Sequence, residues 1–326
     1  MSHIVRDSFL DTVKIISIFM VVFVHTLADL GVGYRADAIY CFMQLVTMPI
    51  FLFISGYFLS LHKPFMMIGK RALEFFFTYC IFSVVWMVIR QKYSLSAIVI
   101  PAKTLWFLLS FPCWILITKW MVKYMNVEKI FLISVLGGVL FGFMPVGKEL
   151  SLQRTFAFYP FFVTGLCIRN SDLINKIKNF NLLFSITFLI FTFTAFIVLK
   201  MDMRWLFCAN VPYIKWDVPL VYAPFVRFIW YLWATVALVS FFRVINLAPN
   251  ITLLSAQGAK TLTVYLYHYF PIYIMDKAVH FSTRNLIILF LIAIAIVILT
   301  LFLHELRFIR YSTMPLHINE IITKNK

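Results

Sequence analysis

Three ionisable residues stand within one apolar stretch near the start of the chain, residues 10–25: Asp11, Lys14 and His25. On an α-helix Asp11 and Lys14 are neighbours. Lys14 and His25 are about three turns apart on the same face, with a rise of about 16 Å between them. Ionisable side chains are costly inside a membrane and usually face the protein interior or a wet cavity. We therefore expect a functional face that combines a carboxylate, an ammonium group and a titratable base. The alternative is that His25 is a hydrogen-bonded packing residue.

A second histidine, His268, lies in a later apolar run beside Tyr265, Tyr267 and Tyr269. The unperturbed pKa of imidazole, about 6.5, lies near neutral pH, which suits a general acid or base. We expect His268 to be a second catalytic residue or to orient a substrate group, and Tyr265 to contact substrate. A purely structural role for this histidine is equally open.

Two basic residues are candidates for binding the phosphates of a donor: Lys14, and Arg71 at the start of the third apolar run. A cation at a helix end can hold a phosphate without a glycine-rich loop. Asp11, three residues before Lys14, would orient its ammonium group or neutralise it. The alternative for both cations is anchoring at the cytoplasmic side of a membrane.

Three further residues are candidates for contacts with an acceptor substrate. Trp106 opens the fourth apolar run, and Arg154 stands just before a short one. We expect both to contact a hydroxyl-rich or anionic acceptor, with anchoring at the membrane interface as the alternative. Ser55, next to Gly56, is a candidate substrate contact at a position where small residues also let two helices approach closely.

The composition is typical of a membrane protein. Of the 326 residues, 63% are hydrophobic and only 13% are charged, which is far from the usual soluble composition. Apolar runs of membrane-spanning length recur throughout. We expect an all-α, polytopic helical bundle that forms a single integral-membrane domain over residues 1–326. The expected spans, about ten, are 12–30, 40–61, 73–89, 104–120, 130–144, 156–168, 182–199, 224–242, 261–275 and 286–303.

The distribution of Lys and Arg favours cytoplasmic N- and C-termini, since basic residues concentrate in the cytoplasmic links of membrane proteins. The longest link on the opposite, outer side is then 200–223, which is rich in aromatic and charged residues. The formal net charge is +16. Because the basic residues lie mostly at the ends of apolar runs, we expect them to meet anionic lipid headgroups rather than nucleic acid.

These features make the chain resemble acyltransferase family three, membrane proteins that O-acylate sugars and polysaccharides. The matching segments follow the family's order along the chain: Leu10-Asp11-x-x-Lys14, Lys14-x10-His25, Pro49 to Tyr57, Leu105 to Leu108, Arg154 to Gly165 and Tyr265 to His268. The chain departs from the family's motifs at Leu52, which stands in the place of the second aromatic residue of the Pro49–Tyr57 segment, and after Arg71. The family often has a second arginine three residues after the one matched by Arg71, where this chain has Glu74.

The resemblance implies a membrane O-acyltransferase, most simply an O-acetyltransferase, that takes an acyl group from cytoplasmic acetyl-CoA. The acceptor would be a hydroxyl of a cell-surface glycan or its lipid-linked precursor. His25 would act as general base or carry the acetyl group as an intermediate, and both routes are open. We expect no permanently bound cofactor, no metal ion and a location in a bacterial cytoplasmic membrane. The alternative is a transporter, permease or flippase for a glycan precursor, because intramembrane ionisable residues also mark transport pathways.

Overall fold

The computed structural model describes residues 8–94, 96–169, 171–247 and 255–313, and these residues form helices joined by links. No β-strand occurs among them; an isolated bridge joins Gly31 to Thr283. The prediction of an all-α fold is confirmed. The helices are α1 Ser8–Leu30, α2 Tyr34–Tyr57, α3 Phe65–Arg90, α4 Ser96–Val99, α5 Trp106–Met121, α6 Val127–Leu140, η1 Phe141–Phe143, η2 Glu149–Ser151, α7 Leu152–Ile168, α8 Leu173–Lys178, α9 Leu182–Val198, α10 Arg204–Phe207, η3 Tyr213–Lys215, α11 Ala223–Ile245, η4 Gln257–Lys260, α13 Thr261–Tyr267, α14 Tyr269–Lys277, α15 Leu286–Leu303 and α16 Arg307–Thr313.

Every predicted span overlaps at least one helix, but the bounds differ: the span 40–61 runs past the end of α2 at Tyr57, and the span 104–120 starts before α5. Among the described residues, five helices are long and apolar enough to cross a membrane: α1, α2, α3, α11 and α15. The helices α5 and α9 are apolar but shorter. The number of crossings and the cytoplasmic placement of the termini therefore stay predictions. The two terminal segments, residues 1–7 and 314–326, lie outside the described residues.

The ninth predicted span is two helices rather than one. The break falls at His268, between α13 and α14. Pro271 follows three residues later and has no backbone N–H, so it cannot continue the hydrogen-bond ladder of α13. His268 itself keeps α-helical dihedral angles (φ −59°, ψ −29°), and its N–H still donates to the carbonyl of Val264 at 3.0 Å. The interruption is therefore a local loss of helical hydrogen bonding next to a proline.

The chain divides into two compact units. Unit 1 comprises Met1–Ile54, Ser171–Phe207 and Tyr231–Glu305. Unit 2 comprises Ser55–Asn170, Cys208–Trp230 and Leu306–Lys326. The predicted single domain over 1–326 stays a prediction.

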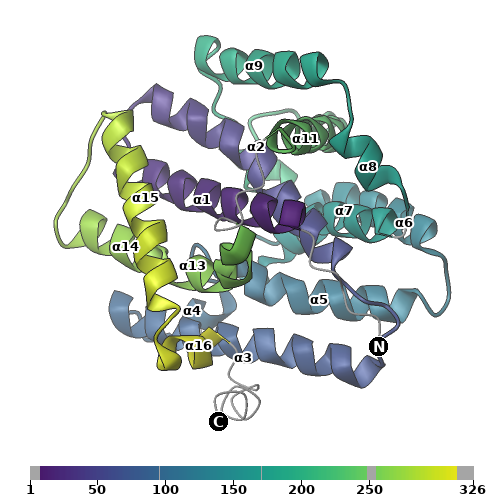
Figure 1. Ribbon diagram of the computed structural model, residues 1–326, viewed down its shortest axis with the longest axis horizontal. Coiled ribbons are helices and arrows are strands. Elements are labelled where there is room, and N and C mark those ends of the chain that lie inside the picture. The colour runs from purple at the N-terminus through teal and green to yellow at the C-terminus, as the bar shows by residue number, and fades with distance from the viewer. Residues whose placement is uncertain (1–7, 95, 170, 248–254, 314–326) are drawn as a thin grey trace. The chain divides into compact units, whose positions relative to one another are not determined.

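In unit 1, α1 packs against α13, α14, α15 and η4, as can be followed in Figure 1. Phe19 and Phe23 of α1 both contact the ring of Phe290 on α15, with ring centroids 5.3 and 5.6 Å apart. Gly258 of η4 lies directly against α1, since a Cβ atom at this position would be 2.8 Å from the Cβ of Asp11 and 2.9 Å from its carbonyl oxygen. The absence of a side chain at Gly258 thus allows η4 to approach the start of α1.

In unit 2, polar side chains join α5 to α7 inside an apolar contact. The indole of Trp114 donates to the carbonyl of Thr155 at 2.7 Å, and the hydroxyls of Ser110 and Thr155 are 2.6 Å apart. Such hydrogen bonds between helices are a common way of fixing packing where apolar surfaces alone give little specificity. Gly56, at the end of α2, fits against the backbone of α7, because a Cβ there would lie 1.8 Å from the carbonyl oxygen of Phe162. The predicted close helix approach at Gly56 is confirmed.

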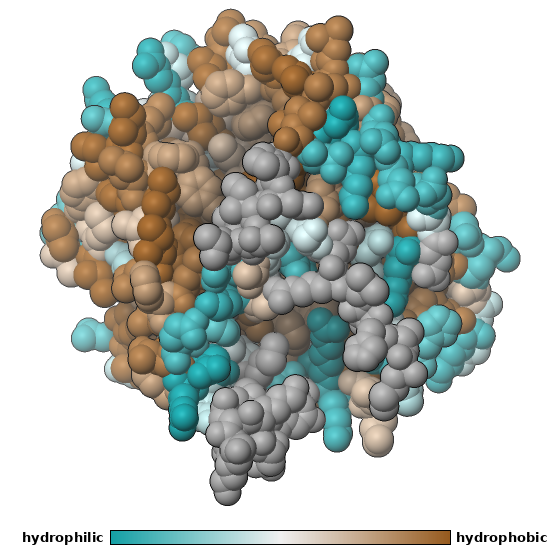
Figure 2. Space-filling view, in the orientation of Figure 1, coloured by the Kyte–Doolittle hydropathy of each residue, from teal (hydrophilic) through white to brown (hydrophobic). Residues whose placement is uncertain are grey.

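Large apolar side chains are exposed on the outside of several helices. On α15 they include Ile287, Leu291 and Phe302, which are 71, 58 and 71% exposed. Figure 2 shows brown, hydrophobic surface over this helix. A helix that exposes so much apolar surface is suited to contact with lipid rather than water.

Candidate functional site

Asp11 and Lys14 form an ion pair on α1. The Nζ atom of Lys14 donates to Oδ1 of Asp11 at 3.0 Å. The carboxylate is buried and the lysine side chain is 22% exposed. Helical spacing predicts this contact, and its effect is to hold the ammonium group beside the first turns of α1.

The two histidines predicted to do chemistry lie against each other in unit 1. His25 is on α1 and His268 is at the junction of α13 and α14, and their ring centroids are 5.3 Å apart. The ring of Tyr269 contacts His25 edge-on at 5.7 Å, and the ring of Tyr265 is 6.4 Å from His268. His268 is fully buried, whereas His25 is partly exposed.

The hydrogen bond made by His268 decides which of its nitrogens carries a proton. Nδ1 lies 3.0 Å from the carbonyl oxygen of Val264, one turn earlier. A carbonyl oxygen only accepts, so Nδ1 carries the hydrogen and Nε2 of the neutral ring is an acceptor. Nε2 is buried and has no hydrogen-bond partner among the described residues. A neutral His268 can thus accept a hydrogen bond from His25 or from a substrate hydroxyl.

The predicted acceptor-binding residues Trp106 and Arg154 contact each other in unit 2. The guanidinium carbon of Arg154 is 5.1 Å from the centre of the Trp106 ring, and Nε of Arg154 donates to the carbonyl of Cys208 at 3.0 Å. Trp106 is the first residue of α5, is buried, and stacks on Phe158 of α7 at 5.3 Å. This burial does not fit an anchor at a membrane interface. The role of Trp106 in acceptor binding stays a prediction.

Arg71 and Ser55 also belong to unit 2. Arg71 lies inside α3 rather than at its start, because α3 begins at Phe65, and its guanidinium carbon is 5.3 Å from the ring centre of Phe111. Ser55 is in the last turn of α2 and is partly buried. The structure thus brings Asp11, Lys14, His25, Tyr265 and His268 into unit 1, and Ser55, Arg71, Trp106 and Arg154 into unit 2.

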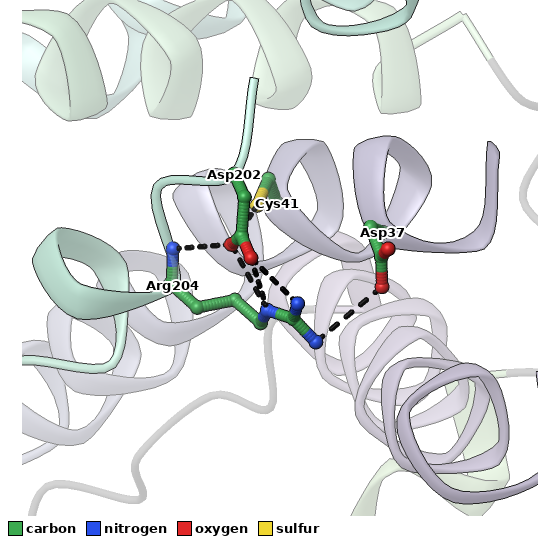
Figure 3. Close-up of polar contacts among 4 residues, drawn as sticks. All are labelled: Asp37, Cys41, Asp202 and Arg204. Carbon is green, nitrogen blue, oxygen red and sulfur yellow. Dashed lines mark hydrogen bonds and ion pairs between the residues drawn. The ribbon is translucent and has the colours of Figure 1, made fainter. Parts of the chain in front are cut away.

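A second ionic group in unit 1 ties the link after α9 to α2 (Figure 3). Arg204 pairs with Asp202 at 2.5 Å and with Asp37 of α2 at 3.3 Å, and the thiol of Cys41 is 4.0 Å from Asp202. The hydrogen bond from Arg204 lowers the pKa of the Asp202 carboxyl below its ordinary value. Because the three charged side chains are almost half exposed, we assign this group a structural role.

Comparison with known proteins assigns the family. A family model described as an acyltransferase domain matches residues 7–305. The chain belongs to acyltransferase family three. Neither the curated proteins nor the solved structures contain a match to the chain. Together with the long apolar helices, membership of acyltransferase family three identifies a membrane acyltransferase.

One charged residue of this family member escaped the sequence analysis. Arg227 falls inside the predicted span 224–242 and is fully buried in α11. A charged residue within a membrane span is a functional candidate by default, and the same rule singled out Lys14. Arg227 could therefore have been found from its position alone, whereas its aromatic neighbours could not, because they come from separate segments of the chain.

Proposed function

We propose that this protein transfers an acyl group, most simply acetyl, from cytoplasmic acetyl-CoA to a hydroxyl of a cell-surface glycan or its lipid-linked precursor. The observation that supports this most directly is the contact between His25, which is on the same helix as Lys14, and His268 at the junction of α13 and α14. Helix α1 thus carries a cation suited to phosphate and one imidazole, and the α13–α14 junction supplies a second imidazole beside the first, a pair suited to proton transfer. The protein would be located in a bacterial cytoplasmic membrane.

His25 is the general base in this proposal. It takes the proton from the acceptor hydroxyl while the hydroxyl oxygen bonds to the thioester carbon. The carbon–sulfur bond then breaks, and the leaving sulfur takes the proton back from His25, so that the products are the O-acyl ester and free CoA. In the other route His25 itself first accepts the acyl group and then passes it to the hydroxyl.

His268 positions the reacting groups. Its Nε2 atom accepts a hydrogen bond, because Nδ1 donates to Val264. An acceptor at this place either orients His25 through its N–H or holds the substrate hydroxyl beside it. Burial of His268 keeps this arrangement away from bulk water.

Lys14 contacts the donor phosphates, and Asp11 holds its ammonium group in place. Lys14 and His25 are about 16 Å apart along α1. An extended pantetheine arm has a similar reach, so phosphates bound at Lys14 would place the thioester near His25. Arg71 is a second donor contact on the basis of the family resemblance, and Ser55, Trp106, Arg154 and Tyr265 are the acceptor contacts.

Transfer of label from acetyl-CoA tests the proposal. Purified protein in detergent or liposomes is incubated with acetyl-labelled CoA and candidate acceptors, including short oligosaccharides of the host's surface glycans. We expect acceptor-dependent release of free CoA and an alkali-labile label on the acceptor. Movement of the acceptor across liposomes with no consumption of acetyl-CoA would instead identify a transporter.

A further inference from the structure

Arg227 is a buried cation whose hydrogen-bonding capacity is unused. The side chain has no exposed surface. None of its three nitrogens, Nε, Nη1 and Nη2, has a hydrogen-bond partner in the part of the chain that the structure describes. An arginine carries five N–H donors and does not lose its charge in proteins. A buried, charged group without acceptors is strongly disfavoured unless something else neutralises it.

Three aromatic rings of unit 2, those of Tyr213, Trp216 and Trp230, surround the guanidinium group. We call these three rings the aromatic cage. The guanidinium carbon is 4.7 Å from the ring centre of Trp216, 5.0 Å from that of Trp230 and 5.8 Å from that of Tyr213. These rings attract the cation through their faces. They accept no conventional hydrogen bond there, so the N–H donors of Arg227 are left for a different group.

Two contacts hold the Tyr213 ring of the cage in place. The Tyr213 hydroxyl donates to the carbonyl of Val139 at 2.7 Å. Its ring packs on Gly142, where a Cβ atom would lie 2.2 Å from the ring. Burial raises the pKa of the Tyr213 phenol, and the positive charge and the N–H donors of nearby Arg227 partly oppose that rise. The phenol is thus neutral at physiological pH and does not neutralise Arg227.

We propose that Arg227 and the rings of Tyr213, Trp216 and Trp230 form a binding site for an oxyanion, a carboxylate or phosphate group. The planar guanidinium fork matches two oxygens of such a group with two parallel hydrogen bonds. The free-energy cost of removing the anion from water is offset by its attraction to the buried positive charge of Arg227.

The aromatic residues around the cage continue toward the predicted acceptor contacts. Trp230 touches Phe158 at 5.5 Å, Phe158 stacks on Trp106 at 5.3 Å, and Arg154 covers Trp106. We infer that the oxyanion belongs to an acidic sugar of the acceptor, an assignment of source that rests on the proposed function. Binding of the anion itself does not depend on acyl transfer.

Access to Arg227 requires a movement of the cage. Because the guanidinium group is not exposed, a ligand reaches it only when one of the rings shifts. Trp216 is the ring on the link between η3 and α11, whereas Trp230 is fixed within α11. Trp216 is therefore the ring expected to move, and its fluorescence is expected to report binding.

The test titrates purified protein in uncharged detergent with three probes, without acetyl-CoA. Glucuronate represents an acidic sugar, glucose is its neutral match, and short-chain phosphatidylglycerol represents a lipid headgroup. Thermal unfolding and tryptophan fluorescence are measured for the wild type, Arg227→Met and Arg227→Lys. Trp120→Phe, which removes an exposed tryptophan of α5, is the fluorescence control.

We expect glucuronate, but not glucose, to raise the unfolding temperature and to change the fluorescence saturably, also in Trp120→Phe. Arg227→Met should lose both responses and unfold no earlier than the wild type without ligand, because a buried uncompensated charge has been removed. Arg227→Lys should bind about ten- to a hundredfold more weakly through loss of the fork.

A response to phosphatidylglycerol alone that is lost in Arg227→Met would support the oxyanion site and assign its source to lipid. Three outcomes would each overturn the site: no response to either anion in the wild type, unchanged responses in Arg227→Met, or wild-type affinity in Arg227→Lys. None of them bears on acyl transfer, which the labelled-donor assay measures separately.

Discussion

The imidazole rings of His25 and His268 lie 5.3 Å apart although they come from opposite ends of the chain. His25 is on the long helix α1, and His268 is at the junction of α13 and α14, three residues before Pro271. The hydrogen bond from Nδ1 to Val264 leaves Nε2 of His268 as an acceptor. The arrangement predicts that the two residues act on the same step of the reaction.

His268→Leu should lower turnover, and His268→Gln should restore part of it, because the glutamine amide oxygen can accept a hydrogen bond near the place of Nε2. The loss should be about ten- to a hundredfold, the value of one charge-assisted hydrogen bond. Turnover of the double variant His25→Ala/His268→Leu should resemble that of His25→Ala alone. Losses that simply multiply in the double variant would show that the two histidines act independently.

Lys14→Ala should weaken acetyl-CoA binding about ten- to a hundredfold, as measured by calorimetry. This variant also leaves the buried Asp11 carboxylate without its ammonium partner, which lowers stability. The matched variant Asp11→Asn/Lys14→Met removes both charges and should recover the fold but not the affinity. Normal affinity in this double variant would place the donor phosphates elsewhere. Arg71→Ala should also weaken binding, an expectation that rests on the family resemblance.

The sequence predicted the helical class and the pairing of Asp11 with Lys14, because both follow from local periodicity. The close helix approach at Gly56 was also predicted, since a residue without a side chain has few other uses in an apolar helix. The break at His268 was not predicted, although the sequence contains Pro271. Residues 261–275 form one apolar stretch, so the two short helices were predicted as one span. The contact of His25 with His268 and the cage around Arg227 depend on tertiary packing of distant segments, which no local pattern encodes.

Gly258→Ala should destabilise unit 1. The added methyl group would meet Asp11 at 2.8–3.0 Å and push η4 away from α1. Overpacking of this kind costs about 1–3 kcal/mol. Gly69→Ala is the control, because a Cβ atom there meets nothing within 4 Å and alanine favours a helix by up to about 1 kcal/mol. Thermal unfolding in detergent should show a lower midpoint for Gly258→Ala only, and equal midpoints for the two variants would exclude the close contact.

The Asp202–Arg204 pair should make a small, pH-dependent contribution to stability. The folded-state pKa of Asp202 is lowered, so the contribution is fully present above the unfolded carboxyl value of about 3.9 and is lost as the pH falls through the lower, folded-state pKa. Because the two side chains are 44 and 48% exposed, the contribution is at most about 1 kcal/mol. Asp202→Asn should therefore unfold earlier than the wild type at pH 7, and the difference should be smaller near pH 3. Asp217→Asn, an exposed acid, should match the wild type at both pH values; an equal loss for both variants would count against the ion pair.

The most direct test of the account measures donor binding and single-turnover acyl transfer in His25→Ala, beside the wild type and His62→Ala. His62 is exposed in the link between α2 and α3, so His62→Ala should behave as the wild type. His25→Ala should bind acetyl-CoA normally but transfer the acyl group about 10²–10⁴-fold more slowly, the usual contribution of a general base. A folded His25→Ala protein that acylates its acceptor near the wild-type rate would contradict the assignment and make His25 a packing residue.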